Sequence, residues 1–570
     1  IPETGCQLED GTDFSGLNGG VYGSSVQFLA NAAAASRTAN FALHYPGEYG
    51  GAAAFVPDIY STAQFSGNPL VAGTTATQNT VYKSAYTAAG TVGSTTLANR
   101  QVGLTPLAKN AQTGSVWGMV YSKQAQRLFV SAMIKRHAGM GPLGPGGIYM
   151  INPSTPDLVG SINFVSLDAL GFPTHATGTY GAGSPLTIGS NTDRGLPANA
   201  VGVPTRDQYA YDQVGKTSLG DIELSEDGRY LFVVNLYDRK LYRIDLQNAA
   251  SPVTPTAAQV TSYSIPNPCT ATNAGEPRPW ALKTHRGKVL TGVVCSGQTA
   301  ANVEVGTSAT MSANVMEFDP TTLIYAATPL YTQNLSYRNP IVLQYNIAGL
   351  SAAWQPWLDT WSTNSFLFGA WAPGQSAVVS TQPVVADIEF DADGNMILGL
   401  LDRHGHQTGS ANYDLAGTGS YSKAFANGDN LHLTKSATCT YSSTAIDYYD
   451  DCVKWRNNDT DPPYGNNCDH NEVFFGSLAS HRFGDKDELV TSSLNPVLDV
   501  SNGYMIVNND DGSHVRGNEI WRDPNWPNSA QTVFGKAAGI GDMEMLGVQS
   551  PIEIGNRVWL DTDNDGVQDA

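Results

Sequence analysis

The sequence has few charged residues and no long apolar run. Only 14% of its residues are charged, against about 25% in ordinary soluble domains. No stretch of about 18 apolar residues occurs, which excludes a membrane-spanning helix. The chain opens at Ile1 without Met and without a basic-then-apolar leader, so we expect that a targeting segment was removed or lies outside this chain.

The common motifs of enzymes are also missing. The sequence contains no G-x-S-x-G elbow, no H-E-x-x-H zinc motif and no C-x-x-C pair, and its glycines lie in turns rather than in a phosphate-binding loop before a helix. We therefore predict no catalytic residues, no cofactor-binding residues and no enzymatic activity. The 59 glycines and 31 prolines instead favour many short strands joined by turns.

Acidic residues outnumber basic ones. The 51 Asp and Glu against 31 Lys and Arg give a net charge of -20. Such a surface repels nucleic-acid phosphates and favours cations, calcium in particular, so we expect no nucleic-acid partner.

The six cysteines are widely spaced, which is typical of disulfides in an oxidising compartment. We predict a local Cys269–Cys295 disulfide. Two of Cys439, Cys452 and Cys468, which share one polar insertion, are expected to pair, which leaves the third for Cys6. The alternative is six buried thiols in a cytosolic protein.

An internal repeat is the strongest signal in the sequence. Residues 220–246 and 386–403 both contain an Asp-Ile-Glu strand, a turn with glycine and a second apolar strand. Asp221 aligns with Asp387, and Gly228 then aligns with Gly394 without a gap. The dipeptides Asp227-Gly228 and Gly394-Asn395 are expected to provide the positive φ angles of tight hairpins.

Weaker copies recur along the chain, at residues 116–134, 279–296 and 503–521, and Gly541 to Glu544 repeats the start of the strong copies. Repeats with one apolar hairpin each are typical of propeller blades, which bury their faces by stacking around an axis. The runner-up is an array of β-sandwiches, for which we would expect evenly spaced strands without the Asp-Ile-Glu recurrence.

We therefore predict an all-β protein with a six- or seven-bladed β-propeller at residues 21–550. Long insertions at 174–213 and 408–470 interrupt the repeat. Residues 1–20 are predicted to be an N-terminal segment that donates a strand to an adjacent subunit or closes its own ring. Residues 551–570 are predicted to be a linker and the start of a second module.

The C-terminal residues have the pattern of a calcium loop. Acidic residues occupy positions 1, 3, 5 and 9 of an EF-hand-like loop, with a carbonyl at position 7; the proposed ligands are Asp561, Asp563, Asp565, Val567 and Asp569. The acid of position 12 is missing because the sequence stops at Ala570. The alternative is a solvated acidic turn.

The segment IGNRVWLDTDNDGVQDA, which ends at Ala570, resembles the opening of the B-type domain of serine-aspartate-repeat (Sdr) surface proteins. Residues 387–409 and 534–546 are similar to propeller regions that precede such modules in large bacterial surface proteins. The resemblance implies a bacterial, extracellular or cell-surface protein with a propeller and the first strand of a calcium-binding, immunoglobulin-like SdrD B-like module. It implies no activity.

Two clusters could carry further chemistry. Asp221, Asp387 and Asp542 occupy the same place in three repeats, so they could form a carboxylate ring that holds a cation; the favoured alternative is that each accepts a backbone N–H of its own blade. Asp402, His404 and His406 would share one face of a strand and could bind a metal. The favoured alternative is hydrogen bonding at a blade edge.

The function predicted from these features is that of an extracellular structural or adhesive surface protein, able to self-associate into a fibre or layer and to bind cell-surface or matrix components. One alternative is a lectin-like propeller, but the aromatic residue expected in each blade is found only as Trp117 and Trp280. The other is a metal-dependent propeller enzyme of the lactonase or dehydrogenase type.

Overall fold

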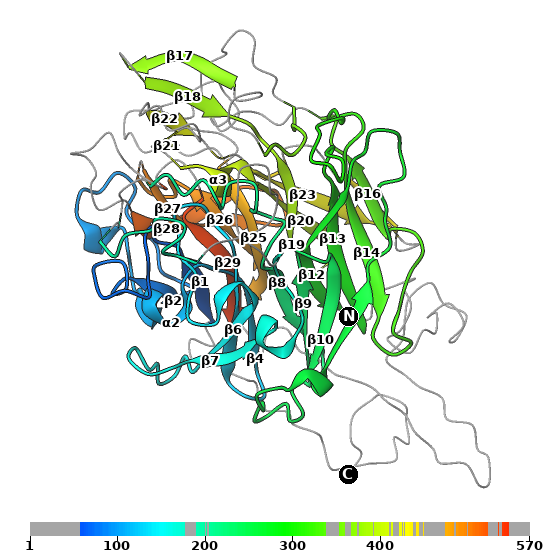
Figure 1. Cartoon of the computed structure of the whole chain (residues 1–570), viewed down its shortest axis with the longest axis horizontal. Helices are drawn as coiled ribbons and strands as arrows, with labels where there is room; N and C mark the ends of the chain where they lie inside the picture. Colours follow the sequence, from blue (N-terminus) through cyan, green and yellow to red (C-terminus); the bar gives the residue numbers. More distant parts are fainter. Residues whose placement is uncertain are drawn as a thin grey trace, which may run out of the picture.

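The strands of this protein are buried on both faces. In β9 (Tyr230–Asn235), which reads YLFVVN, every residue after Tyr230 is buried. A strand of this kind needs a neighbouring sheet on each side, and the chain meets that need by arranging its sheets radially (Figure 1). The propeller prediction is confirmed, with six blades.

The computed structural model describes residues 57–176, 190–199, 201, 205–337, 353–359, 366–372, 375–391, 393–409, 412–413, 421–424, 426, 428–436, 440–443, 448–449, 473–483, 486–498, 500–522, 534 and 538–546.

We number the blades I to VI, and each is given from the axis to the rim. Blade I contains β29 (Ile540–Leu546), β1 (Asp58–Ala63), β2 (Asn79–Ala85) and β3 (Thr105–Lys109). Blade II contains β4 (Val116–Ser122), β5 (Arg127–Ala132), β6 (Gly147–Ile151) and β7 (Asn163–Ser166). Blade III contains β8 (Leu219–Leu224), β9, β10 (Lys240–Asp245) and β11 (Val260–Ser264).

The other three blades follow in chain order. Blade IV contains β12 (Pro277–His285), β13 (Lys288–Cys295) and β14 (Ser312–Asp319), with β15 (Ile324–Tyr325) and β16 (Tyr331–Asn334) both paired to β14. Blade V contains β19 (Pro383–Phe390), β20 (Met396–Asp402), β23 (Gly428–Lys435) and β24 (Tyr441–Ser443). Blade VI contains β25 (Phe474–Phe483), β26 (Lys486–Leu494), β27 (Ser501–Asn508) and β28 (His514–Arg522).

The ring is closed by two strands from opposite ends of the described chain. The inner strand of blade I is β29, and it pairs antiparallel with β1, so that Asp58 lies opposite Leu546 and Tyr60 opposite Glu544. The inner strands then pack in the order β29, β4, β8, β12, β19 and β25, and β25 returns to β29. The Gly541–Glu544 segment therefore completes the first blade instead of starting another one.

The core lies between the blades. One cluster of buried side chains joins Phe232 of blade III, Phe318 of blade IV and Leu398 of blade V, all with no exposed surface. Burying a side chain of this size stabilises the fold by roughly 1.5–3 kcal/mol, so these contacts help to hold neighbouring blades together.

The glycines of the two hairpin turns have the predicted positive φ angles. Gly228 and Gly394 have φ angles of 67° and 78°, and the N–H of Gly228 donates to the carbonyl of Ser225. The backbone of the neighbouring Asp227 and Asn395 does not enter the positive-φ region, so in each turn glycine alone provides it.

Helical structure is short. The described residues contain two single-turn α-helices and four 3-10 turns, namely α2 (Asn110–Thr113), α3 (His404–Gln407), η3 (Leu97–Asn99), η4 (Gly144–Gly146), η5 (Asp168–Leu170) and η6 (Ala257–Gln259). In this described part of the chain, no helix is both long and apolar enough to cross a membrane.

A seventh sheet lies outside the ring. It is built from two insertions, and its strands are β17 (Phe366–Ala372), β18 (Gln375–Val379), β22 (Tyr421–Ala424) and β21 (Asn412–Tyr413). Strands β17 and β18 lie at the top of Figure 1, beyond the blades. This sheet explains why the repeat is interrupted between blades IV and V and again inside blade V.

The predicted Cys269–Cys295 disulfide is confirmed. It joins the segment before β12 to the last residue of β13 across a sequence separation of 26, with the two Cα atoms 5.4 Å apart. Cys6, Cys439, Cys452 and Cys468 lie outside the described residues. So do residues 1–20 and 551–570, and with them the predicted domain boundaries.

We expect the Cys269→Ser, Cys295→Ser double variant to lose about 3 kcal/mol of unfolding free energy, because closing a loop of this length restricts the unfolded chain. Chemical denaturation under non-reducing conditions measures the loss, and peptide mapping without reduction should recover the linked pair. Alkylation of both cysteines in unreduced native protein would contradict the assignment.

Candidate functional site in the axial region

Three aspartates on alternate blades each connect their own blade to the next one at the axis. Asp542, Asp221 and Asp387 lie on the inner strands of blades I, III and V. The Oδ1 atom of each accepts the N–H of the next residue, at 2.7–2.8 Å. The Oδ2 atom of each accepts an N–H from the inner strand of the next blade. We call these three residues the latch aspartates.

The three donors to Oδ2 occupy equivalent positions. Asp542 accepts from Met119 at 3.0 Å, Asp221 from Leu282 at 2.9 Å, and Asp387 from Leu478 at 2.7 Å. In every case the donor strand has a register shift that ends at the donor residue, in β4, β12 and β25 respectively. A bulge leaves a backbone N–H without a ladder partner, and the aspartate of the preceding blade supplies the missing acceptor.

The inner-strand position that holds a latch aspartate in blades I, III and V holds a small residue in the blades between them. In blades II, IV and VI the residue that precedes the donor is Gly118, Ala281 or Ser477. At Gly118 an added Cβ would lie 2.9 Å from the Cα of Asp221, so a larger residue would push blade III away. The arrangement therefore has approximate threefold repetition, with one blade pair as its unit.

Burial raises the pKa of all three latch aspartates well above the ordinary value, and each is raised further by another latch aspartate. Among the described residues, however, no group of three or more His, Cys, Asp or Glu side chains is placed to hold a metal ion. The structure supports the amide-bonding alternative, with the difference that each carboxylate bonds the next blade as well as its own.

A second acidic level lies two residues further along the same strands, where Glu544, Glu223 and Glu389 each accept the N–H of the following residue. Lys283 of blade IV forms an ion pair with Glu389. Although burial opposes its charge, Glu389, Glu223 and Glu544 raise the pKa of Lys283 well above the ordinary value. Lys283 is thus the counter-ion of this level.

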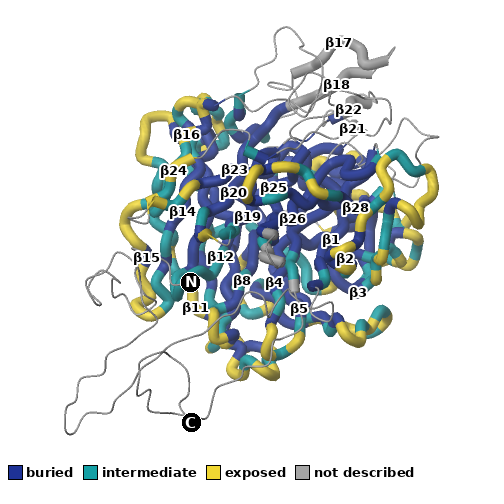
Figure 2. The backbone as a smooth tube through the Cα atoms, turned by 180° about the vertical axis from the view of Figure 1, so that it is seen from behind, coloured by how far each residue is buried: buried dark blue, intermediate teal, exposed yellow. Residues whose placement is uncertain are grey.

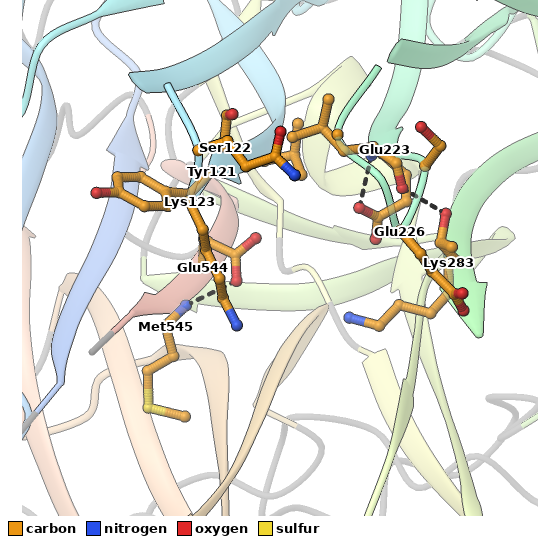
Figure 3. Close-up of a pocket in the computed structure, with 14 residues that line it drawn as sticks. Tyr121, Ser122, Lys123, Glu223, Glu226, Lys283, Glu544 and Met545 are labelled. Atoms are coloured by element: carbon orange, nitrogen blue, oxygen red, sulfur yellow. Dashed lines mark hydrogen bonds between the residues drawn. The ribbon is translucent and has the colours of Figure 1, made fainter. Parts of the chain in front are cut away.

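A pocket of about 440 Å³ opens between the inner strands of four blades at this level. Glu544 and Lys123 lie on one side of it, and Glu223, Glu226 and Lys283 on the other (Figure 3). Burial and the neighbouring Glu223 and Glu389 outweigh the opposing effect of Lys283 and raise the pKa of Glu544 to about 7. We call this cavity the axial pocket. The Asp-x-Glu repeat pointed to its aspartate as a candidate site residue, whereas nothing in the sequence pattern indicated a role for the glutamate or for Lys283.

Asp402 ends strand β20, but His404 and His406 lie in the single helical turn α3 and not on the expected strand. The Oδ1 atom of Asp402 accepts the N–H of Gln382 at 2.8 Å and that of His404 at 2.9 Å. Burial lowers the pKa of His404 to about 3 and that of His406 well below the ordinary value. The Nδ1 atom of His406 lies 3.2 Å from Nζ of Lys135. These contacts fit the hydrogen-bonding alternative.

Buried ion pairs fill the end of the propeller where the inner strands begin. Asp359 accepts from Arg403 at 3.0 Å and from Lys216 at 2.5 Å, and Arg194 pairs with Asp207 at 2.6 Å. The side chains of Arg403, Arg194 and Asp207 have no exposed surface. This end is therefore a packed polar core, whereas the axial pocket lies at the opposite end.

Trp117 and Trp280 are core residues. They are at most 1% exposed, and their rings meet edge to face at 5.6 Å. Neither ring offers a surface on which a sugar could stack, so both belong to the blade packing. The predicted calcium ligands Asp561, Asp563, Asp565, Val567 and Asp569 lie outside the described residues.

No family model matches the chain. Proteins of Dictyostelium discoideum to which it is similar include colossin-A, 24% identical over 483 residues; colossin-C, 22% identical over 476 residues; and colossin-D, 25% identical over 335 residues. These matches cover 82%, 81% and 58% of this chain but only 4%, 41% and 29% of the respective relatives. The resemblance to bacterial Sdr proteins is wrong as an identification, because these relatives are eukaryotic.

Solved structures that match include a nidogen–laminin complex and the periplasmic gluconolactonase of Pseudomonas aeruginosa. Each has a TM-score of 0.31 and 9% identity, and each match covers 86% of this chain and 99% or 100% of the other. At these scores the likeness carries no argument about function.

We expect Asp221→Ala to lower the unfolding free energy by about 1–3 kcal/mol, because the buried N–H of Leu282 then has no acceptor. Asp393→Ala is the matched control, since Asp393 is exposed and accepts no hydrogen bond among the described residues. Urea denaturation of both variants measures the difference. Equal stabilities would contradict the bridging role.

The latch aspartates also predict a pH dependence. A carboxyl whose folded pKa is raised binds more protons in the folded state, so its contribution to stability falls as pH rises above about 3.8 and levels off beyond the folded pKa. Asp387→Asn removes one such group and keeps one acceptor oxygen. The decline of unfolding free energy between pH 4 and pH 8 should therefore be shallower in the variant than in the wild type, as measured by urea denaturation at each pH. A steeper decline would contradict the raised pKa.

Proposed function

We propose that the protein is a structural or adhesive module of an extracellular protein, located at the cell surface or in the matrix. The property that serves this function is a rigid, closed ring. The observation that carries the proposal is the axial arrangement. The three carboxylates that could have served chemistry are committed to backbone amides, and the ring is closed by pairing β1 with β29.

Three further features support an extracellular location and a modular role. The Cys269–Cys295 disulfide is suited to an oxidising compartment. The low charge content leaves wide uncharged surfaces that can contact neighbouring molecules. The similarity to colossin-A covers 4% of that protein, as one module of a long chain would. Self-association into a fibre or layer and calcium binding at the C-terminal acidic loop remain parts of this proposal.

The axial pocket favours an enzyme as the second candidate. Glu544, whose pKa is raised to about 7 by burial, would be matched to proton transfer near neutral pH. No observation of comparable weight favours a lectin, because Trp117 and Trp280 are buried.

Labelling of intact cells with a membrane-impermeant reagent tests the location, and we expect the protein to be labelled without permeabilisation. Labelling only after permeabilisation would contradict an extracellular role. Purified protein is also expected to give no saturable signal on a glycan array and no hydrolysis of dihydrocoumarin. Hydrolysis that Glu544→Gln abolishes would favour the enzyme, and saturable glycan binding would favour the lectin.

A further inference from the structure

The outer edge of blade III differs from the other blade edges. Strand β11 reads VTSYS and contains no charged residue and no proline, and four of its five residues are at least partly exposed (Figure 2). Its five register pairs with β10 are consecutive, without a bulge. Natural edge strands usually carry a charge, a proline or a bulge that prevents another strand from adding, and β11 has none of these.

The other described outer strands are protected or shorter. Strand β3 contains Pro106 and Lys109 and has two register shifts. Strand β28 carries Arg, His and Glu and is covered by blade I, where Gly90 donates to Gly517. Strands β7, β16 and β24 have four, four and three residues. Strand β11 is therefore the most regular open edge among the described outer strands of the six blades.

The ladder fixes which backbone groups of β11 face outward. The N–H of Leu246 donates to the carbonyl of Arg229, which makes the flanking pair Tyr230 and Asp245 a non-hydrogen-bonded one. Alternation along β10 then directs the backbone groups of Arg243 toward Thr261. It follows that the N–H and C=O groups of Ser262 and Ser264 point away from the sheet, where another strand could pair with them.

The guanidinium group of Arg243, which forms no ion pair with the described acids, lies beside this edge. The Arg243 guanidinium stacks between two rings, with its Cζ atom 4.5 Å from the centroid of Tyr230 and 5.8 Å from that of Tyr263. The nearby cations Arg229 and Lys240 each form an ion pair, Arg229 with Asp245. The hydrogen bond from Arg229 lowers the pKa of Asp245, and the charge of Arg243 lowers it further, but Arg243 itself forms no ion pair with a described acid. Stacking occupies the faces of the guanidinium and leaves its N–H donors at the rim.

We propose that β11 is a docking edge for an extended acidic segment of a partner protein, which adds to blade III as a further strand. Strands lie about 4.8 Å apart, so the incoming strand would be about 10 Å from β10, across the small Thr261, within reach of the Arg243 side chain. The pairing with Ser262 and Ser264 supplies main-chain affinity, and the charge of Arg243 selects a carboxylate. The inference extends the proposed function by naming the chemistry of a partner.

The probe is a capped ten-residue peptide that alternates threonine and glutamate, and fluorescence anisotropy measures its binding to the full chain. We expect saturable binding that weakens at least tenfold when lysine replaces glutamate, or when alternate peptide nitrogens are methylated. Absence of saturable binding, or equal binding of the methylated peptide, would overturn the proposal.

Two variants locate the edge. Ser262→Pro removes an outward N–H without removing a ladder bond, so the blade should fold and peptide binding should be lost. Ser262→Ala is the control, because it removes the same hydroxyl and its hydrogen bond to Tyr242 but keeps the N–H. Arg243→Gln should lower affinity for the glutamate peptide at least fivefold and leave the lysine peptide unchanged. If Ser262→Pro fails to fold, the methylated peptide on wild-type protein decides the same point.

Sedimentation tests the remaining possibility, which is that β11 pairs with a second copy of this chain. Self-association that Ser262→Pro abolishes, without binding of the glutamate peptide, would assign β11 to a second copy of this chain and overturn an acidic partner. A protein that is extracellular and fully folded but binds no peptide would overturn the docking edge and leave the proposed structural role standing.

Discussion

The bridge from a buried aspartate to a backbone N–H of the next blade is the interaction on which the rest of this propeller depends. A bulge in the inner strand of blades II, IV and VI frees one N–H in a place that water does not reach, and an unpaired N–H there costs about 1–3 kcal/mol. Asp542, Asp221 and Asp387 remove that penalty. The bulge and the aspartate therefore require each other, and the six blades behave as three pairs.

This solution concentrates negative charge along the axis. Burial and mutual repulsion raise the pKa of each latch aspartate, so the ionised ring opposes the fold that its hydrogen bonds support. At the next level blade IV supplies Lys283, which faces Glu389, Glu223 and Glu544. One lysine cannot serve three glutamates equally. Glu389 takes the ion pair, the pKa of Glu544 is raised to about 7, and the threefold repetition ends at the axial pocket.

The sequence predicts the parts of this fold that local pattern encodes. The aligned Asp221 and Asp387, each followed by a glycine turn, were sufficient to predict equivalent blade strands and a propeller. The partners of these aspartates could not be predicted. The donors are backbone N–H groups, which do not depend on the side chains of Met119, Leu282 or Leu478. The period-two alternation expected of a strand also gave a wrong prediction at α3, where tertiary packing decides the local structure. The short C-terminal resemblance misidentified the relatives because it covered under 20 of the 570 residues.

Ring closure has a mechanical consequence. Asp58 and Leu546 are register partners, so the chain enters and leaves blade I at the same end of the β1–β29 pair. A load transmitted through the two flanking segments would open this pair one hydrogen bond at a time, as a zipper, and would not shear all of its bonds together. As β29 peels away it withdraws Asp542 from Met119, so closure and one latch are lost in a single event. A chain under tension would lengthen here first, while the pairs built on Asp221 and Asp387 stay folded.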